Sequence, residues 1–407
     1  MSLAALSQVP RGGQEEVPSL AALLGLTSLG GDIILPADRS RAYEAFIQAD
    51  KAFGRYSRLK LRWGRLPVKT PHFAPLDLRP LGMASEAPLP LDIMRAGDPR
   101  TVRPSLPLTT APLMPAPFMT PWDELVFAGW REALSLSWTG TGRRDPVGVE
   151  VTGQGGLVLE PIFAEVTPGA EGTLFLRWTG SAEPSFHLTA LQATVGEGGR
   201  LKIVLLHDGK ACHHHLTGRI EVGRDARVEV FGAWMGGAWT VARFSAALAA
   251  PGASWNETHL IAVSGKEHMD LDSQVQQSAK GTSCDIQVKA VAADDSRAVF
   301  TGNILMDEGA QLSKALLADH ILLLSKGARA DSIPGLEIKA ADVQASHAAS
   351  VGQVDEEELF YLQSRGLTES EARHLIIVGF LRSLLDRAPL SALPEILDPV
   401  LEAKLRA

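Results

Sequence analysis

The sequence has little cysteine and no surplus of positive charge. Its 407 residues include two cysteines, Cys212 and Cys284, which form no Cys-x-x-Cys pair. A disulfide framework is therefore not expected, and a reducing compartment is the simpler prediction. The formal net charge of −8 disfavours nucleic acid and anionic membrane surfaces as partners, because proteins that hold either are normally basic.

Long apolar runs are also missing. No stretch approaches the roughly 20 consecutive apolar residues that a membrane helix requires. Near the start, Leu20–Leu26 is apolar, but it is too short for the core of a signal peptide and follows Glu15 and Glu16. We therefore expect a cytoplasmic protein that does not cross a membrane.

The signatures of several enzyme classes are absent from the sequence as well. There is no GxxxxGK[ST] phosphate loop, so the chain itself should not hydrolyse ATP. Neither a GxSxG nucleophile elbow nor an HExxH zinc motif is present. These absences predict a protein that is not an enzyme.

Three regions differ in composition and periodicity. Residues 1–95 are predicted to hold an N-terminal helical region, with the clearest helical spacing in Arg41–Phe53, and a connector. Prolines are frequent from Pro67 to Pro121, which predicts an extended path there. Residues 96–354 are predicted to form the core domain, and residues 355–407 a C-terminal helical domain.

The core region is rich in short β-type runs, such as Thr173–Trp178, Leu201–Leu206 and Ile286–Val291. Glycine at the corners between such runs permits a positive φ or a close backbone approach, and alanine fits where successive layers stack. The small turns that recur between the runs are Pro168-Gly169-Ala170, Pro251-Gly252-Ala253, Glu308-Gly309-Ala310 and Lys326-Gly327-Ala328, with Gly223-Arg224-Asp225-Ala226 as a looser copy.

More than 200 residues of short strands without a helical pattern are typical of a large sandwich, a propeller or a solenoid. The aromatic signatures of propeller repeats are missing, and the corners at Gly309 and Gly327 are interpreted as one short coil apart. We therefore predict a mainly β protein with a right-handed parallel β-helix core, flanked by N-terminal and C-terminal helical regions.

After Val354 the pattern becomes helical. Asp355 is a predicted N-cap, and Thr368-Glu369-Ser370-Glu371 is a predicted capping box. The helices that begin at Asp355 carry more apolar surface than a short tail needs, which favours docking against another protein. The second helix supplies one apolar face. Its predicted apolar face consists of Ala372, Leu375, Ile376, Gly379, Phe380 and Leu384.

The segment Cys212-His213-His214-His215 raises the possibility of a metal site. On a strand, only Cys212 with His214, or His213 with His215, can share a face, and zinc normally requires three or four convergent ligands. His207 could supply another ligand from one coil away, but an exposed corner of the β-helix is the favoured interpretation. Cys284, in an alternating segment, is expected to be a small apolar filler in the core.

A dense set of motifs occupies the stretch from Arg297 to Leu385. It begins with Arg297-Ala298-Val299-Phe300 and is densest from Ser346-His347 through Asp355-Glu356-Glu357 to Ser364-Arg365-Gly366. This combination of β-helix corners, a histidine and two capped helices in a fixed order resembles the SufB/SufD family, whose members assemble iron–sulfur clusters in the SUF system.

The resemblance implies a non-catalytic subunit of an assembly scaffold, in the SufD-like branch of the family. SufB-like members carry a cysteine after the Phe-Tyr pair, where this sequence has Leu362. SufD-like members carry Cys-Ser-His, where this sequence has Ala345-Ser346-His347. His347 is therefore the predicted ligand for iron or for a nascent iron–sulfur cluster, shared with SufB at the interface and not held by the chain alone.

The partners that the resemblance implies are a SufB-like paralogue, pairing β-helix to β-helix, and a SufC-like ATPase on the C-terminal helices. A homodimer is possible when the chain is alone. Two alternatives stay open: a SufB-like scaffold paralogue, and a β-helix enzyme that acts on polysaccharide through convergent carboxylates. The predicted partner-binding residues are Phe360, Tyr361, Arg365, Leu375, Ile376 and Phe380.

Overall fold

The structure is a computed structural model that describes residues 73–74, 77–80, 92–95, 122–123, 125–126, 132–140, 146–152, 155–180, 184–209 and 212–406. The helix predicted at Arg41–Phe53 lies outside these residues. Three short strands fall in the predicted connector, and each pairs with a strand of the core: β1 (Phe73–Ala74), β2 (Asp77–Pro80) and β3 (Asp92–Arg95). The connector is thus built in part into the sheets.

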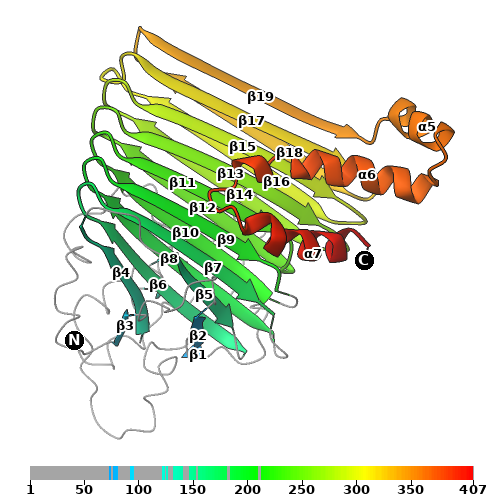
Figure 1. The fold of residues 1–407 in the computed structure, drawn as a ribbon, viewed down its shortest axis with the longest axis horizontal. Coiled ribbons are helices and arrows are strands. Elements are labelled where there is room, and N and C mark those ends of the chain that lie inside the picture. Colours follow the sequence, from blue (N-terminus) through cyan, green and yellow to red (C-terminus); the bar gives the residue numbers. More distant parts are fainter. Residues whose placement is uncertain are drawn as a thin grey trace, which may run out of the picture.

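Two long sheets make up the core (Figure 1). Sheet I contains β1, β3, β4 (Glu132–Trp138), β6 (Gly156–Val166), β8 (Ser185–Val195), β10 (Cys212–Val222), β12 (Trp239–Leu248), β14 (His268–Gln277), β16 (Arg297–Met306) and β18 (Arg329–Ile338). Sheet II contains β2, β5 (Val147–Thr152), β7 (Glu171–Thr179), β9 (Arg200–His207), β11 (Arg227–Trp234), β13 (Ser254–Val263), β15 (Ser283–Ala292), β17 (Ser313–Leu323) and β19 (Val343–Gln353).

From β4 onward, successive strands alternate between the two sheets, and each strand pairs in parallel with the strand two positions later in the chain. Thr240 of β12 pairs with Met269 of β14, which pairs with Ala298 of β16, so one coil takes 29 residues at this level. A chain that climbs in this way, with each coil contacting the coils above and below, is a β-solenoid. The prediction of a parallel β-helix is confirmed.

The interior of the β-helix is largely apolar. Alternate side chains of both sheets point inward, and paired residues on neighbouring coils share the same face. Trp138, Trp178, Trp234 and Trp255 are the largest side chains inside and are almost fully buried. Because each coil stacks its inward side chains on those of its neighbours, the interior is one continuous column.

The Gly-Ala corners have the two properties that the sequence predicted. Gly169 and Gly252 adopt positive φ values of 71° and 72°. A Cβ on Gly309 would lie 2.4 Å from the carbonyl oxygen of Ser278, so this corner needs glycine for a close backbone approach. The alanines of all five corners are buried: Ala170, Ala226, Ala253, Ala310 and Ala328.

The spacing of the corners was misinterpreted, however. The turn at Gly309 joins β16 to β17, whereas the turn at Gly327 joins β17 to β18. These two corners lie on opposite edges of the same coil and are not one coil apart. The reason is that each coil contains two strands and therefore needs two corners.

Three α-helices and a 3₁₀ turn follow the last strand: α5 (Glu356–Ser364), α6 (Glu369–Arg382), η4 (Leu385–Arg387) and α7 (Leu393–Arg406). The predicted caps are present, since the Asp355 side chain accepts from the backbone N–H groups of α5 and Thr368 forms a capping box with Glu371. In the part of the chain that the structure describes, no helix is long and apolar enough to cross a membrane.

The C-terminal helices lie along the outer face of sheet II, with α5 projecting beyond it (Figure 1). Apolar residues of β7, β9, β11, β13 and β15 pack there against α6, η4 and α7. The side chains of α6 that turn inward are Ala372, Ile377, Val378 and Leu381. The predicted apolar face is therefore wrong at Leu375, which is 53% exposed, because the sheet and not the helix alone selects the buried face.

Candidate functional site

The β-helix is open at its C-terminal end. The last strands, β18 and β19, form the outer edges of sheets I and II, and no strand of the described residues covers them. Most side chains of β19 are exposed. A strand edge of this kind presents unpaired backbone N–H and C=O groups, to which another chain can add a strand.

His347 lies on this open edge and faces the interior column. In the register of β17 with β19, His347 pairs with Leu317, which is fully buried in the core. Because paired residues share a face, the imidazole lies on the inward face of β19, at the open end of the interior column. No coil of the described residues stacks above it, so His347 is exposed although its neighbour below is buried.

Asp319 is a buried carboxyl group in the coil below His347. It is 0% exposed, and neither carboxylate oxygen has a hydrogen-bond partner. Burial raises its pKa above the usual range, while the Ser332 hydroxyl and the charges of His320 and His347 act in the opposite direction. No motif in the sequence marks Asp319, since its inward position between Leu317 and Ile321 becomes visible only in the strand register.

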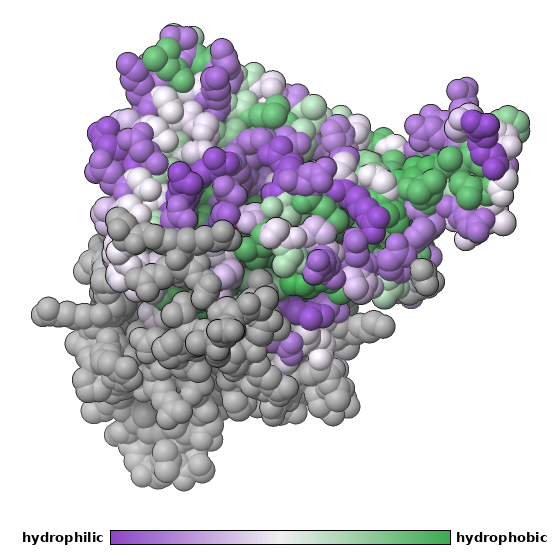
Figure 2. All heavy atoms as spheres, viewed as in Figure 1, coloured by the Kyte–Doolittle hydropathy of each residue, from purple (hydrophilic) through white to green (hydrophobic). Residues whose placement is uncertain are grey.

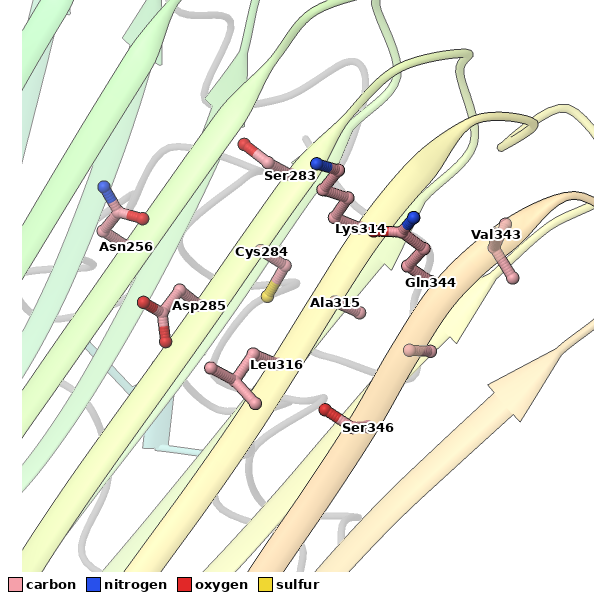
Figure 3. Close-up of a pocket in the computed structure, with 11 residues that line it drawn as sticks. Asn256, Ser283, Cys284, Asp285, Lys314, Ala315, Leu316, Val343, Gln344 and Ser346 are labelled. Carbon is pink, nitrogen blue, oxygen red and sulfur yellow. The ribbon is translucent and has the colours of Figure 1, made fainter.

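Ser346, beside His347, points to the other face of β19. There it lines a groove of about 640 Å³ that runs over the starts of β13, β15, β17 and β19 (Figure 3). The groove and the imidazole of His347 therefore lie on opposite sides of the strand, and the groove is not part of the same site. Cys284 belongs to the buried core, and burial raises the pKa of its thiol well above the usual range.

A second exposed surface lies where α5 meets α6. Phe360, Tyr361 and Leu375 are 71%, 57% and 53% exposed. Apolar residues gather at this junction on the face shown in Figure 2, and the groove between the helices is about 460 Å³. The residues that line it are Glu357, Glu358, Tyr361, Leu362 and Ile376.

The other predicted partner-binding residues differ in how exposed they are and in what they contact. The guanidinium of Arg365 lies over the ring of Tyr361, 5.6 Å from its centroid, and remains exposed. Phe380 turns towards sheet II, where the Lys289 ammonium lies 4.5 Å from the centre of its ring. Tyr361, Ile376 and Leu375 are thus better placed than Phe380 to meet another protein.

The segment Cys212–His215 is not an exposed corner, so that interpretation was wrong. It is the start of β10, which lies between β8 and β12 in sheet I. Cys212 and His214 point into the β-helix, and His213 and His215 point out, as strand alternation requires. His207, at the end of β9, stacks on His214 with 5.2 Å between ring centres, so it does approach from the facing sheet.

The inward thiol and imidazoles influence one another. Burial lowers the pKa of His187. The charges of Cys212 and Glu160 outweigh this effect of burial, so the pKa of His187 is raised to about 10. Burial would raise the pKa of the Cys212 thiol, but the neighbouring His187 and His207 lower it to about 6. Burial lowers the pKa of His214 well below the usual range. Among the described residues, no three His, Cys, Asp or Glu side chains form a ready-made metal site.

These features define a parallel β-helix protein with an open strand edge and an exposed apolar surface where α5 meets α6. The family described as "SUF system FeS cluster assembly, SufBD core domain" matches residues 150–380. That match covers more than half of the chain. The chain belongs to the SufB/SufD family of iron–sulfur cluster assembly proteins.

Several relatives are similar to parts of the chain. A SufBD family protein of Synechocystis sp. is 41% identical over 105 residues, which cover 26% of this chain and 23% of the relative. SufD of Bacillus subtilis is 31% identical over 184 residues, which cover 45% of this chain and 42% of the relative. A SufBD family protein of Mycobacterium tuberculosis is 27% identical over 274 residues, 64% of this chain and 68% of the relative. The chain thus spans less than half the length of the first two relatives.

Proposed function

We propose that this chain is a SufD-type, non-catalytic subunit of an iron–sulfur cluster assembly scaffold. It pairs with a SufB-like paralogue through the open end of the β-helix and lends His347 to iron or a nascent cluster at that interface. The observation that carries the proposal is an exposed imidazole facing the interior at the uncovered edge of the last coil. Leu362 supports the SufD-type role, because a SufB-like member would have a cysteine there.

The open edge also suits the proposed pairing. Val351 is 45% exposed on β19, next to backbone groups that no described strand covers, and Leu316 is 40% exposed on the neighbouring strand β17. Burying such apolar area while completing strand hydrogen bonds stabilises a complex. When the paralogue is absent, a second copy of this chain can use the same edge, so we propose a homodimer for the isolated protein. The two free, buried cysteines agree with a cytoplasmic location.

The junction of α5 and α6 is the proposed docking surface for a SufC-like ATPase. It is the part of the C-terminal region that combines exposed apolar side chains with a groove. Deleting everything from Thr368 onward, which would be the simplest test of a separate tail, would also uncover the apolar outer face of sheet II. Substitutions of exposed residues therefore test docking more cleanly than truncation.

We expect the double substitution Phe360→Ser and Leu375→Ser to reduce co-purification of the ATPase by roughly tenfold or more, since loss of central apolar contacts costs a few kcal/mol. The β-helix should keep its melting temperature, because both side chains are more than half exposed. The measurement is a pull-down from co-expressing cells with thermal melting of the same variant.

The matched control for this test is Leu312→Asn. Leu312 is also 53% exposed, but it lies in the turn between β16 and β17. Undiminished ATPase binding by the double variant would place the docking surface elsewhere, and equal loss in the Leu312 variant would mean that any exposed apolar substitution disturbs the protein.

The isolated chain should neither hydrolyse ATP nor hold a stable iron–sulfur cluster. Such clusters are usually held by about four thiolates. This chain has two cysteines, which are buried on separate coils and cannot converge. Anaerobic reconstitution with iron and sulfide, followed by gel filtration and visible absorbance, should give no stoichiometric cluster, and phosphate release should equal the background. A cluster that survives gel filtration would contradict this prediction.

A further inference from the structure

A polar cluster lies inside the β-helix, far along the chain from His347. It consists of Cys212 and His214 on β10, His187 on β8, Glu160 on β6 and, from the facing sheet, His207 on β9. None of the five side chains is more than 1% exposed. Buried polar groups are costly unless they are paired, so this cluster within an apolar column requires an explanation.

One half of the cluster is firmly held. Glu160 accepts hydrogen bonds from the indole N–H of Trp178, at 2.9 Å, and from the Thr189 hydroxyl, and it pairs with Nδ1 of His187. The other ring nitrogen of His187, Nε2, faces Ser185, whose hydroxyl lies 2.9 Å away. It also faces Cys212, which pairs with Ser185 in the strand register. A carboxylate behind the far nitrogen of an imidazole is the usual second layer of a metal-binding histidine.

The other half of the cluster has polar atoms without partners. Neither ring nitrogen of His207 has a hydrogen-bond partner, and Nδ1 of His214 has none either. Nε2 of His214 is satisfied by the Thr189 hydroxyl at 2.8 Å. The His207 ring lies beside Cys212 and stacks on His214. The unpartnered nitrogens therefore belong to His207, which lies beside the thiol, and to His214, which shares its face of β10.

A similar network elsewhere in the interior has no such defect. Glu257 accepts from the indole of Trp255 at 2.9 Å and from the Ser273 hydroxyl at 2.6 Å, and pairs with Nε2 of His259 at 2.8 Å. Nδ1 of His259 accepts from the indole of Trp234 at 3.1 Å. This network hydrogen-bonds no thiol, although Cys284 lies near Glu257 on the neighbouring strand β15, and it satisfies both imidazole nitrogens. The two networks thus differ in the unpartnered imidazole nitrogens, which are found at Cys212 and not at Cys284.

We propose that Cys212, His187 and His207 bind one thiophilic divalent transition-metal ion, with Glu160 as the carboxylate behind His187. Thiolate and imidazole are the ligands that zinc and ferrous iron share. Ligand distances of about 2.3 Å for sulfur and about 2.0–2.1 Å for nitrogen place a sulfur and a nitrogen on one ion roughly 3.5 Å apart, close to ordinary contact distance.

Binding requires a small rearrangement. His187 exchanges its hydrogen bond to Ser185 for the metal, and His207 turns one unpartnered nitrogen towards it. The Cys212–His187 pair releases one proton to solvent as the sulfur–metal and nitrogen–metal bonds form. The bound cation also offsets the negative charges of the thiolate and of Glu160 in the dry interior. His214 stays on Thr189 and packs against the site.

The test uses the full chain, because the site is closed by complete coils. The protein is expressed with added zinc, or with added ferrous iron under anaerobic conditions, and metal content is measured after gel filtration. A third preparation with cobalt reports the ligands, since a thiolate bound to Co²⁺ gives a charge-transfer band in the near ultraviolet. We expect about one ion per chain and that band. The zinc and iron preparations decide which metal the site prefers.

Cys212→Ser and His207→Gln should each reduce metal content to background and remove or alter the cobalt band. Glu160→Gln should weaken binding roughly tenfold to 100-fold, as loss of a supporting carboxylate usually does. Cys284→Ser is the matched control, because Cys284 is the other buried cysteine and lies outside the cluster. Cys284→Ser and His347→Ala should both retain the metal.

Metal-free wild-type protein in both the zinc and the iron preparation would overturn the proposal and leave buried water as the partner of His207. Equal metal content in Cys212→Ser and wild type would also overturn it. Thermal melting of each variant shows whether it is folded, and if Cys212→Ser unfolds, His207→Gln decides, since glutamine preserves volume and polarity there.

Discussion

His347→Ala should abolish cluster formation in the co-expressed complex while leaving the complex assembled. The imidazole is exposed at the open end of the interior, so it is free to meet iron or a thiolate of the partner. One exposed side chain contributes little to a large interface, but loss of a metal ligand removes its chemistry almost completely. The measurement is iron and acid-labile sulfide per complex, with the subunit ratio, and we expect a fall of roughly tenfold or more.

His320→Ala is the matched control. His320 lies on the neighbouring strand β17, faces outward and bonds to the Ser350 hydroxyl at 2.7 Å. It should therefore leave cluster content unchanged. Normal loading in His347→Ala would show that the histidine has no part in the chemistry, and loss of the subunits before loss of iron would show a structural role instead.

Glu257→Ala should destabilise the β-helix more than any other single change considered. The carboxylate is completely buried and is the common partner of Trp255, His259 and Ser273. Its removal leaves an indole, an imidazole and a hydroxyl unpaired in the core. Breaking a buried network from one side costs about 3–5 kcal/mol. The free energy of unfolding, measured by chemical denaturation, should fall by that amount. The variant should also be digested by protease at a lower temperature than the wild type.

Glu229→Ala provides the comparison. Glu229 lies on the outer face of β11 and pairs with the half-exposed Arg227 at 2.8 Å. Exposed ion pairs contribute about 0–1 kcal/mol, so this variant should unfold almost as wild type does. If Glu257→Ala also lost less than about 1 kcal/mol, the buried network would not be a determinant of stability.

Much of the architecture could be predicted from local patterns. Alternating strands and Gly-Ala corners indicated a β-helix because each corner has a backbone requirement that the sequence states directly, as at Gly169 and Gly252. The helices after Asp355 and Thr368 were predicted because caps and first turns are contacts within a few residues. The sequence motifs from Arg297 to Leu385 indicated the SufB/SufD family without any structural information.

The candidate sites depended much more on contacts between coils. Cys212 meets His187 and His207, and Asp319 lies near His347 in the coil below, because coils of roughly 29 residues stack residues that are distant in sequence. A pattern along one strand fixes alternation but not which coil faces which. The sequence of Cys212–His215 alone therefore does not show that this segment lies inside the β-helix.

By itself the sequence determined the solenoid and the position of the helical region. These follow from steric requirements of single turns, from capping and from the two-residue period of a strand. His347 was indicated by the family resemblance and not by these local rules. Only the tertiary structure decided which side chains share the interior and which face of α6 is buried. Leu375 and Ile377 are equally apolar, but only Ile377 meets sheet II, since burial of a helix face is set by the surface it packs against.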